Sequence, residues 1–406
     1  MKEYLKMAWR NLGRNRRRTA ITTASVLFAV FFATVEQSFH LGIWHNLLEN
    51  VLHSYTGYLQ IHASGYQENK NFDYTFPWNE DTEKALHVSK DIKALIPRLE
   101  SFALASSGER TKPVIVAGID PGKEYGFSHL PEKLAQGKML EPEDQGALLS
   151  RRLAEYLKLK VGDTLLMISQ GYAGTSAAGI FPVRGIVRLP APEWDNQMVY
   201  LTLPTARQFY SAENMLTTLV VDLRNPSTLE KTAGKLSHTL GSHFEVLTWK
   251  QMLTELYQQY ISDVGSGYIL LGLLYLIIGF GIFGTLMMML NERRYELGVM
   301  TAVGMKKRKI AVLISTEVVL LAFLGILLGI AAALPVMLWF HHHPVTLSGT
   351  MAKTMEIYGM EPEIPALLEP GFIFKQGIAV LLLTFMALVW PVISVFRLSP
   401  VKALRR

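Results

Sequence analysis

Four long apolar runs dominate the pattern of hydrophobic and polar positions along this chain. They cover residues 19–41, 266–290, 310–340 and 372–396. Each run has at least the roughly 20 residues that an α-helix needs to cross the hydrocarbon core of a bilayer. The pattern therefore predicts four transmembrane helices, of which the third is long enough to tilt or to extend beyond the bilayer.

The segment between the first two runs, residues 42–265, has the mixed pattern of an α+β domain. Short alternating or continuously apolar stretches predict strands at 57–63, 112–120, 181–189, 198–203, 217–223 and 243–249. Residues 146–169 predict a strand, a helix, a turn and a strand, and two further helices are predicted at 204–210 and 228–240. The irregular order favours a compact mixed domain or two small subdomains over a Rossmann sheet.

Basic residues are concentrated in three short segments and set the orientation. Arginines precede the first run, Arg and Lys residues fill the segment 291–309, and more of them follow the fourth run in the tail 397–406. By the positive-inside rule these segments are cytoplasmic, so both termini are inside while the large domain and the loop 341–371 are outside. The net charge of +6 therefore requires no nucleic-acid partner. The first run is best interpreted as an uncleaved signal anchor.

The first 18 residues have a helical pattern of their own. Their apolar positions fall on one face, at Tyr4, Leu5, Ala8, Trp9 and Leu12. This predicts a cytoplasmic amphipathic helix lying on the membrane surface, and a solvated basic tail is the alternative.

The search for catalytic and metal-binding motifs is negative. The sequence lacks the phosphate-binding loop, the zinc-protease and nucleophile-elbow motifs, and any cysteine. We therefore expect no enzyme activity, no catalytic residue, no metal site and no cofactor in this chain. The histidines of HHHP at 341–344 point in different directions on a helix, which favours a polar cap over a metal site.

Two carboxylates and three small residues stand out within the membrane runs. Glu36 and Glu317 are functional candidates because ionisable groups at hydrocarbon depth need partners or water. Glu36 lies where its helix is expected to leave the bilayer, and Glu317 is expected to form a hydrogen bond inside the bundle. Gly325, Gly329 and Ala333 recur every four residues and predict close helix packing, with a helix of this chain or of a second subunit.

The cytoplasmic segment 291–309 is more elaborate than a connecting turn. It predicts a helix that ends at Gly304. Its apolar face comprises Tyr295, Val299, Ala302 and Val303. This favours a docking helix for a cytoplasmic partner, and an interfacial helix that only covers the membrane surface is the alternative.

At this point the sequence resembles a known family. NERRYELGVMTAVG resembles the E-R-x-x-E-[IL]-G-x-x-x-A-x-G signature of the MacB/FtsX-type ABC transporter permeases, the type VII or mechanotransmission class. MAWRNLGRNRRRTAIT and FRLSPVKALR are similar to the two ends of that family, and GYLQIH is similar to its lipoprotein-releasing, LolC/LolE-like members. The chain departs from the signature at Thr301, where the family usually has Arg or Lys.

The resemblance implies a permease subunit in a bacterial inner membrane. Two copies of a separate ABC ATPase would bind ATP and Mg and dock on the short helix, and a second permease subunit, identical or paralogous, would complete the transporter among the membrane lipids. The first two spans would continue outward as stalks toward Asn50 and from Leu253. The docking residues that the resemblance implies are Glu292, Arg293, Glu296, Leu297, Gly298, Ala302 and Gly304.

The implied cargo is a lipoprotein released from the inner membrane. Three other functions remain open: efflux of a peptide, antibiotic or toxin, regulation of a cell-wall hydrolase, and a membrane sensor without transport.

Overall fold

The computed structural model describes residues 2–14, 16–78, 83, 89–357 and 362–397. The chain divides into two compact units. The helical unit comprises Met1–His45, Tyr260–Thr346 and Glu363–Arg406, and the sheet unit comprises Asn46–Gln259 and Leu347–Pro362. The predicted tail beyond residue 397 lies outside the described residues.

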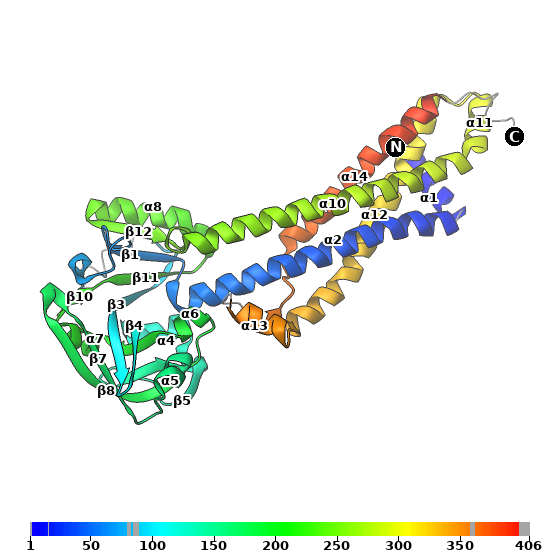
Figure 1. The fold of residues 1–406 in the computed structure, drawn as a ribbon. Helices are drawn as coiled ribbons and strands as arrows, with labels where there is room; N and C mark the ends of the chain where they lie inside the picture. Colours follow the sequence, from blue (N-terminus) through cyan, green and yellow to red (C-terminus); the bar gives the residue numbers. More distant parts are fainter. Residues whose placement is uncertain (1, 15, 79–82, 84–88, 358–361, 398–406) are drawn as a thin grey trace. The chain divides into compact units, whose positions relative to one another are not determined.

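Four long helices form the frame of the helical unit (Figure 1). They are α2 (Arg16–Val51), α10 (Thr254–Glu292), α12 (Lys307–His342) and α14 (Pro370–Phe396). All four are long and apolar enough to cross a membrane, which confirms the predicted four-helix membrane fold. The last residues of α2, 46–51, and the first residues of α10, 254–259, belong to the sheet unit in this division.

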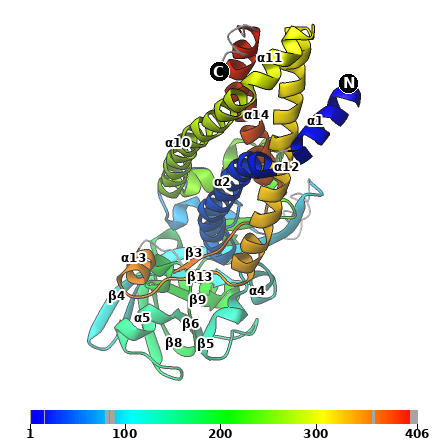
Figure 2. The ribbon, with the colours of Figure 1, turned by 90° about the vertical axis from the view of Figure 1, so that its right-hand side faces the viewer.

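Two short helices complete this unit. They are α1 (Lys2–Arg14), which packs against α12, and α11 (Arg294–Ala302), which lies between the ends of α10 and α12 (Figure 2). The predicted apolar face of α1 is divided, because Ala8 is buried while Trp9 is 65% exposed. Adjacent helical positions differ by about 100°, so packing on α12 through Ala8 leaves Trp9 outside.

The small residues of α12 pack directly on α2. A Cβ built on Gly325 would lie 2.6 Å from Val26 Cβ, and one on Gly329 would lie 2.8 Å from the Leu27 carbonyl oxygen. Ala333 is fully buried one turn further along α12. The close packing predicted for these residues is therefore present, and the neighbouring helix belongs to the same chain.

A polar contact joins α2 to α10 near their outer ends. Asp263 Oδ2 accepts a hydrogen bond from Trp44 Nε1 at 2.6 Å and lies 3.0 Å from His40 Nε2. Gly267 leaves room for the His40 ring, since a Cβ there would lie 2.4 Å from His40 Cε1.

The sheet unit is built on one hydrogen-bonded sheet of ten strands, in the order β12-β1-β11-β3-β4-β9-β6-β8-β5, with β7 paired to β3 and β8. Its strands are β1 (Leu59–Ala63), β3 (Ile92–Ser107), β4 (Arg110–Ile119), β5 (Leu134–Gly137), β6 (Ala147–Ser150), β7 (Thr164–Gln170), β8 (Ser176–Val187), β9 (Met198–Thr202), β11 (Thr218–Leu223) and β12 (Phe244–Thr248). Antiparallel pairs predominate, with parallel pairing of β4 with β9 and of β6 with β8. This is an α+β domain, as predicted.

The helices of this unit lie around the sheet and in the connections between strands (Figure 1). They are α4 (Pro121–Ser128), α5 (Arg151–Leu157), α6 (Pro192–Asp195), α7 (Leu203–Tyr210), α8 (Leu229–Leu240) and α9 (Trp249–Met252). A further helix, α13 (Thr350–Ile357), lies in the loop between α12 and α14. The predicted helices at 204–210 and 228–240 correspond to α7 and α8. The short strands β2 (Phe76–Pro77) and β10 (Met215–Leu216) pair together in this unit. The short strands β13 (Val345–Thr346) and β14 (Glu363–Ile364) pair together in the helical unit.

A buried ion pair fixes the end of the first long helix to this sheet. After Val51 the chain continues as a five-residue π-helix, Leu52–Thr56. Arg98 of β3 is fully buried and donates hydrogen bonds to both carboxylate oxygens of Glu124, at 2.8 and 2.7 Å, and to the Tyr55 carbonyl oxygen at 2.6 Å. Carbonyls at a helix end have no partner within the helix, and here a buried cation supplies one.

Candidate docking site at the short helix α11

The short helix α11 is separated from α10 and from α12 by residues with non-helical backbone angles. Arg293 adopts φ −90° and ψ 0° between the end of α10 and the start of α11. Gly304 adopts φ +100°, and the amide of Met305 donates to the Met300 carbonyl at 3.0 Å, which closes the helix end. Gly304 reaches this conformation without the steric cost of a side chain. α11 is therefore a distinct element rather than a continuation of α10.

One side of α11 is apolar and exposed. Tyr295, Val299 and Val303 are 59%, 38% and 84% exposed, and they follow one another at intervals of four residues. Residues at this spacing share one face of a helix. The apolar face predicted from the sequence therefore points away from the helical unit.

The other side of α11 is packed against the long helices. Leu297 is 2% exposed, and it belongs to an apolar cluster that includes Leu286 of α10 and Ile314 of α12. Gly298, next to it, is also buried. These contacts hold the helix against the ends of α10 and α12.

A buried carboxylate links α11 to two other helices. Glu317 of α12 has a side chain that is 1% exposed, and it accepts hydrogen bonds from Arg293 Nη1 and from Asn11 Nδ2, the latter at 2.5 Å. This agrees with the expectation that Glu317 forms a hydrogen bond inside the bundle. Since Asn11 lies on α1, one carboxylate connects α1, α12 and the start of α11.

A second, exposed ion pair joins α1 to α11. Arg14 Nη2 lies 2.9 Å from Glu296 Oε1, and both side chains are about half exposed or more. Solvent screens such pairs, so this contact contributes much less than the buried one.

The residues predicted to contact a partner divide between the two sides of α11. Glu292, Glu296, Ala302 and Gly304 are exposed. Arg293, Leu297 and Gly298 face the helical unit, where they position the helix. Thr301 is half-buried, and its hydroxyl donates to the Leu297 carbonyl at 2.8 Å.

Sequence reasoning missed Asn11 and Arg14. The sequence contains only an indirect signal for Asn11. A carboxylate as deep in the bundle as Glu317 requires hydrogen-bond donors, and the polar residues of the amino-terminal helix can supply them.

The other predicted residues lie outside this site. Glu36 is exposed on α2. His341 Nδ1 lies 2.9 Å from the Ala366 carbonyl oxygen, and the His343 ring stacks on Trp339 at 4.5 Å. Within the described part of the chain, no group of three or more His, Cys, Asp or Glu residues is placed to hold a metal ion.

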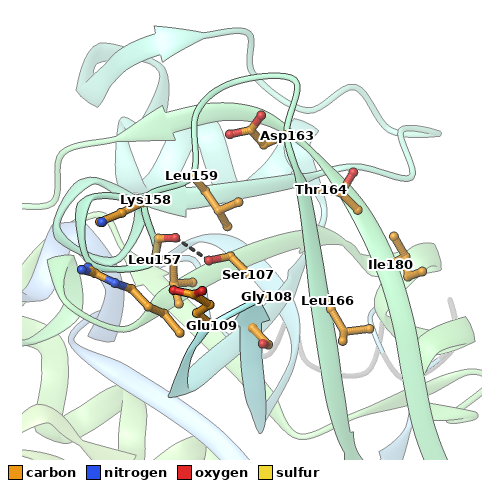
Figure 3. A pocket seen from close by; sticks show the side chains of 12 residues that line it. Ser107, Gly108, Glu109, Leu157, Lys158, Leu159, Asp163, Thr164, Leu166 and Ile180 are labelled. Carbon is orange, nitrogen blue, oxygen red and sulfur yellow. Dashed lines mark hydrogen bonds between the residues drawn. The ribbon is translucent and has the colours of Figure 1, made fainter.

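The sheet unit carries a pocket at the turn between β3 and β4 (Figure 3). It has a volume of about 580 Å³ and is lined by the turn residues 106–110, the end of α5 and the exposed side chains of Leu166 and Ile180. Ser107 Oγ donates to the Leu157 carbonyl at its edge.

The same face of the sheet is apolar beyond this pocket. Leu104 is paired with Ile168 and Leu166 with Ile180 across neighbouring strands, so these side chains lie together, and all four are exposed. An exposed apolar patch of this kind is typical of a contact surface for another molecule.

Comparisons with known families agree with this architecture. Residues 19–239, more than half of the chain, match the MacB-like periplasmic core domain, and residues 268–400 match the FtsX-like permease C-terminal region. Four membrane helices with such a domain between the first two define the permease subunit of an ABC transporter. Within this class the chain belongs to the MacB/FtsX-type permeases.

Individual relatives are distant. The chain is 23% identical over 322 residues to the lipoprotein-releasing system transmembrane protein LolC from two strains of Xylella fastidiosa, Temecula1 and 9a5c, and the alignment covers 76% of each chain. Among solved structures it is similar to the periplasmic region of MacB from Actinobacillus actinomycetemcomitans, with 16% identity and a TM-score of 0.36 over 53% of this chain and 97% of the other. The family and the four apolar helices indicate a protein of the inner membrane.

Proposed function

We propose that this chain is a permease subunit that couples ATP hydrolysis by a separate ATPase to the release of lipoproteins from the inner membrane. The ATPase binds ATP and Mg and docks on α11 at the cytoplasmic side. Two ATPase copies and a second permease subunit, identical or paralogous, complete the transporter. The work is done on the other side of the membrane, at the sheet unit.

The observation that carries this proposal is the two-sided construction of α11. Its outer side exposes Tyr295, Val299 and Val303, which a folded protein rarely leaves uncovered as a continuous stripe. Its inner side is tied to α12 through the Arg293 and Glu317 side chains. A helix held in this way can bind a partner on one side and pass a displacement to the membrane helices on the other.

The proposed orientation rests on the distribution of basic residues. Arg14 contacts α11 through Glu296, and Lys307 at the start of α12 donates to the Phe396 carbonyl at the end of α14, at 2.9 Å. The end of α1, the segment 291–309 and the end of α14 therefore lie at the same end of the helical unit. The positive-inside rule then favours a cytoplasmic location for this end and for both termini.

The proposed cargo rests on the relatives named above, which are lipoprotein-releasing proteins, and on the exposed apolar patch of the sheet unit. Leu104, Leu166, Ile168 and Ile180 offer a surface on which an apolar partner or acyl chain can lie.

Co-purification of the full chain with the candidate ATPase tests the docking step. Val299→Asp places a charge on the exposed face of α11, and Val161→Asp is a matched control because Val161 is 40% exposed on the sheet unit. We expect Val299→Asp to lose the ATPase and Val161→Asp to retain it. Full recovery of the ATPase with Val299→Asp would exclude α11 as the docking element.

Reconstitution tests the cargo separately. Proteoliposomes that contain the wild-type complex and a labelled lipoprotein should lose label from the membrane in an ATP-dependent way. ATP hydrolysis without release would leave the permease assignment in place and reject lipoproteins as the cargo.

A further inference from the structure

An open groove runs between α12 and α14 in the helical unit, on a side of α12 that the docking site does not use. Its volume is about 450 Å³. Ala311 and Ser315 lie on its α12 side, Val392 and Phe396 lie on its α14 side, and Arg308 lines one end.

The groove exists because α12 presents small side chains where α14 passes. Ala311 and Ser315 are four residues apart, so they share one helix face and leave space beside the bulkier Val392 and Phe396. At the rim, Lys307 Nζ donates to the Phe396 carbonyl at 2.9 Å and holds the two helices together.

The length of the groove corresponds to one leaflet of a bilayer. Its lining runs along α12 from Arg308 to Leu320, which at 1.5 Å per residue is about 18 Å. Half of the hydrocarbon core measures about 15 Å. An acyl chain that enters beside Arg308 would therefore lie along the groove to about the middle of the bilayer.

The charge at the Arg308 end is uniformly positive. Arg308 is exposed, and in the described part of the chain no carboxylate lies within ion-pair distance of it. Lys306 and Lys309, also exposed, flank it, and the segment 305–316 contains no acidic residue. The apolar groove matches the acyl chain of an anionic lipid, and its cationic end matches the headgroup, since basic pockets between membrane helices bind lipid headgroups.

We propose that this groove is a binding site for an anionic phospholipid. One acyl chain occupies the groove between α12 and α14, and the headgroup phosphate binds the Arg308 guanidinium. The site is independent of the cargo and of the ATPase. Its occupancy, at the start of α12 next to α11, would depend on the content of anionic lipid in the surrounding leaflet.

Native mass spectrometry of the full chain tests this site. The purified protein is titrated with phosphatidylglycerol and, separately, with phosphatidylcholine of the same acyl chains. We expect the wild type to bind phosphatidylglycerol about fivefold more tightly than phosphatidylcholine. One basic residue near the membrane surface contributes about 1 kcal/mol to the binding of an anionic lipid, which corresponds to this factor. Arg308→Gln should abolish the preference, and Lys309→Gln, which removes a charge that does not line the groove, should reduce it less.

A second pair of variants separates the apolar part of the site. Ser315→Phe fills the groove and should remove one bound lipid of either type. The control Ala331→Phe adds the same ring at an exposed position of α12 outside the groove and should leave lipid binding unchanged. Equal binding of both lipids by the wild type, or unchanged lipid binding by Ser315→Phe, would overturn the proposal. A dimer that is lost with Ser315→Phe would instead show that a helix of a second copy fills the groove.

Discussion

Arg293, at the junction of α10 and α11, pairs with Glu317 of α12, and both side chains are nearly closed to solvent, with exposures of 11% and 1%. Asn11 donates to the second oxygen of the same carboxylate. A buried charge that loses its partner remains desolvated without compensation, which costs more than the pair itself contributes. The position of α11 therefore depends on a carboxylate that lies outside the family signature.

We expect Arg293→Ala to lower the free energy of unfolding of the helical unit by roughly 3–5 kcal/mol, because Glu317 would stay buried without its cation. Glu317→Gln should cost less, because the more exposed Arg293 keeps Glu296 at 4.0 Å and an amide oxygen as partners, and Asn11 keeps a side-chain acceptor. Both variants should weaken co-purification of the ATPase, because α11 loses its anchor. Chemical unfolding in detergent, followed by circular dichroism, measures the stability change.

The exposed pair between Arg14 and Glu296 provides the control for this experiment. Arg14→Ala should change stability by less than about 1 kcal/mol, since solvent screens the pair. An equal loss in Arg14→Ala and Arg293→Ala would contradict the special role of the buried pair.

The contact of α12 with α2 leads to a second prediction. At Gly329 an added Cβ would lie 2.8 Å from both the Leu27 carbonyl oxygen and Val30 Cβ, so Gly329→Leu must push the two helices apart. Overpacking of this kind typically costs about 1–3 kcal/mol. Thermal unfolding should show a lower midpoint for Gly329→Leu. In Gly272→Leu, where a Cβ meets nothing within 4 Å, the midpoint should not fall.

Much of the fold could be predicted from regular patterns. The membrane helices have continuous apolar runs, and strands such as β1, β4 and β11 are bounded and apolar, so local pattern and final structure coincide. The exposed face of α11 could be predicted for the same reason, because Tyr295, Val299 and Val303 keep the helical spacing.

The longest strand shows why other parts could not be predicted. β3 spans Ile92–Ser107 and carries Pro97 and Arg98 near its middle, residue types that argue against a central strand. Arg98 is tolerated there because Glu124, from α4, neutralises it after folding. The contact of Asn11 with Glu317 is similar, since 306 residues separate the partners in sequence. Such pairs are defined by tertiary structure and leave no local pattern.

The buried pair of Arg98 and Glu124 allows a third prediction. Arg98→Met removes the cation from a carboxylate whose side chain is 1% exposed and should destabilise the sheet unit by roughly 3–5 kcal/mol. The double variant Arg98→Met, Glu124→Leu should be more stable than Arg98→Met alone, because the fully buried carboxylate of Glu124 is removed together with its cation. Glu100, whose side chain is 14% exposed and lies 3.5 Å from Arg98 Nη1, loses its cation in both variants. Denaturant unfolding followed by tryptophan fluorescence measures both. A double variant as unstable as the sum of the two single variants would show that the two side chains act independently.

The sheet unit should also lose stability in mild acid because of His62. This side chain is 2% exposed, its Nδ1 lies 2.9 Å from the Thr217 carbonyl oxygen, and its Nε2 lies 2.9 Å from the side-chain amide of Gln60. Burial lowers the pKa of His62 below its ordinary value of 6.5, although the hydrogen bond to Thr217 offsets part of that effect. Well above pH 6.5 the imidazole is neutral in both states, so it adds no pH dependence there.

As the pH falls through 6.5, the unfolded chain binds a proton at His62 that the folded chain does not, and stability decreases until the lowered folded pKa is reached. Within this window the slope is at most about 1.4 kcal/mol per pH unit. Thermal unfolding of the full chain between about pH 7.5 and about pH 5.5 should therefore show a steeper decline for the wild type than for His62→Gln. Because all other titrating groups are common to both proteins, the difference between the two curves reports His62. Parallel curves would mean that His62 has the same pKa in the folded and unfolded states.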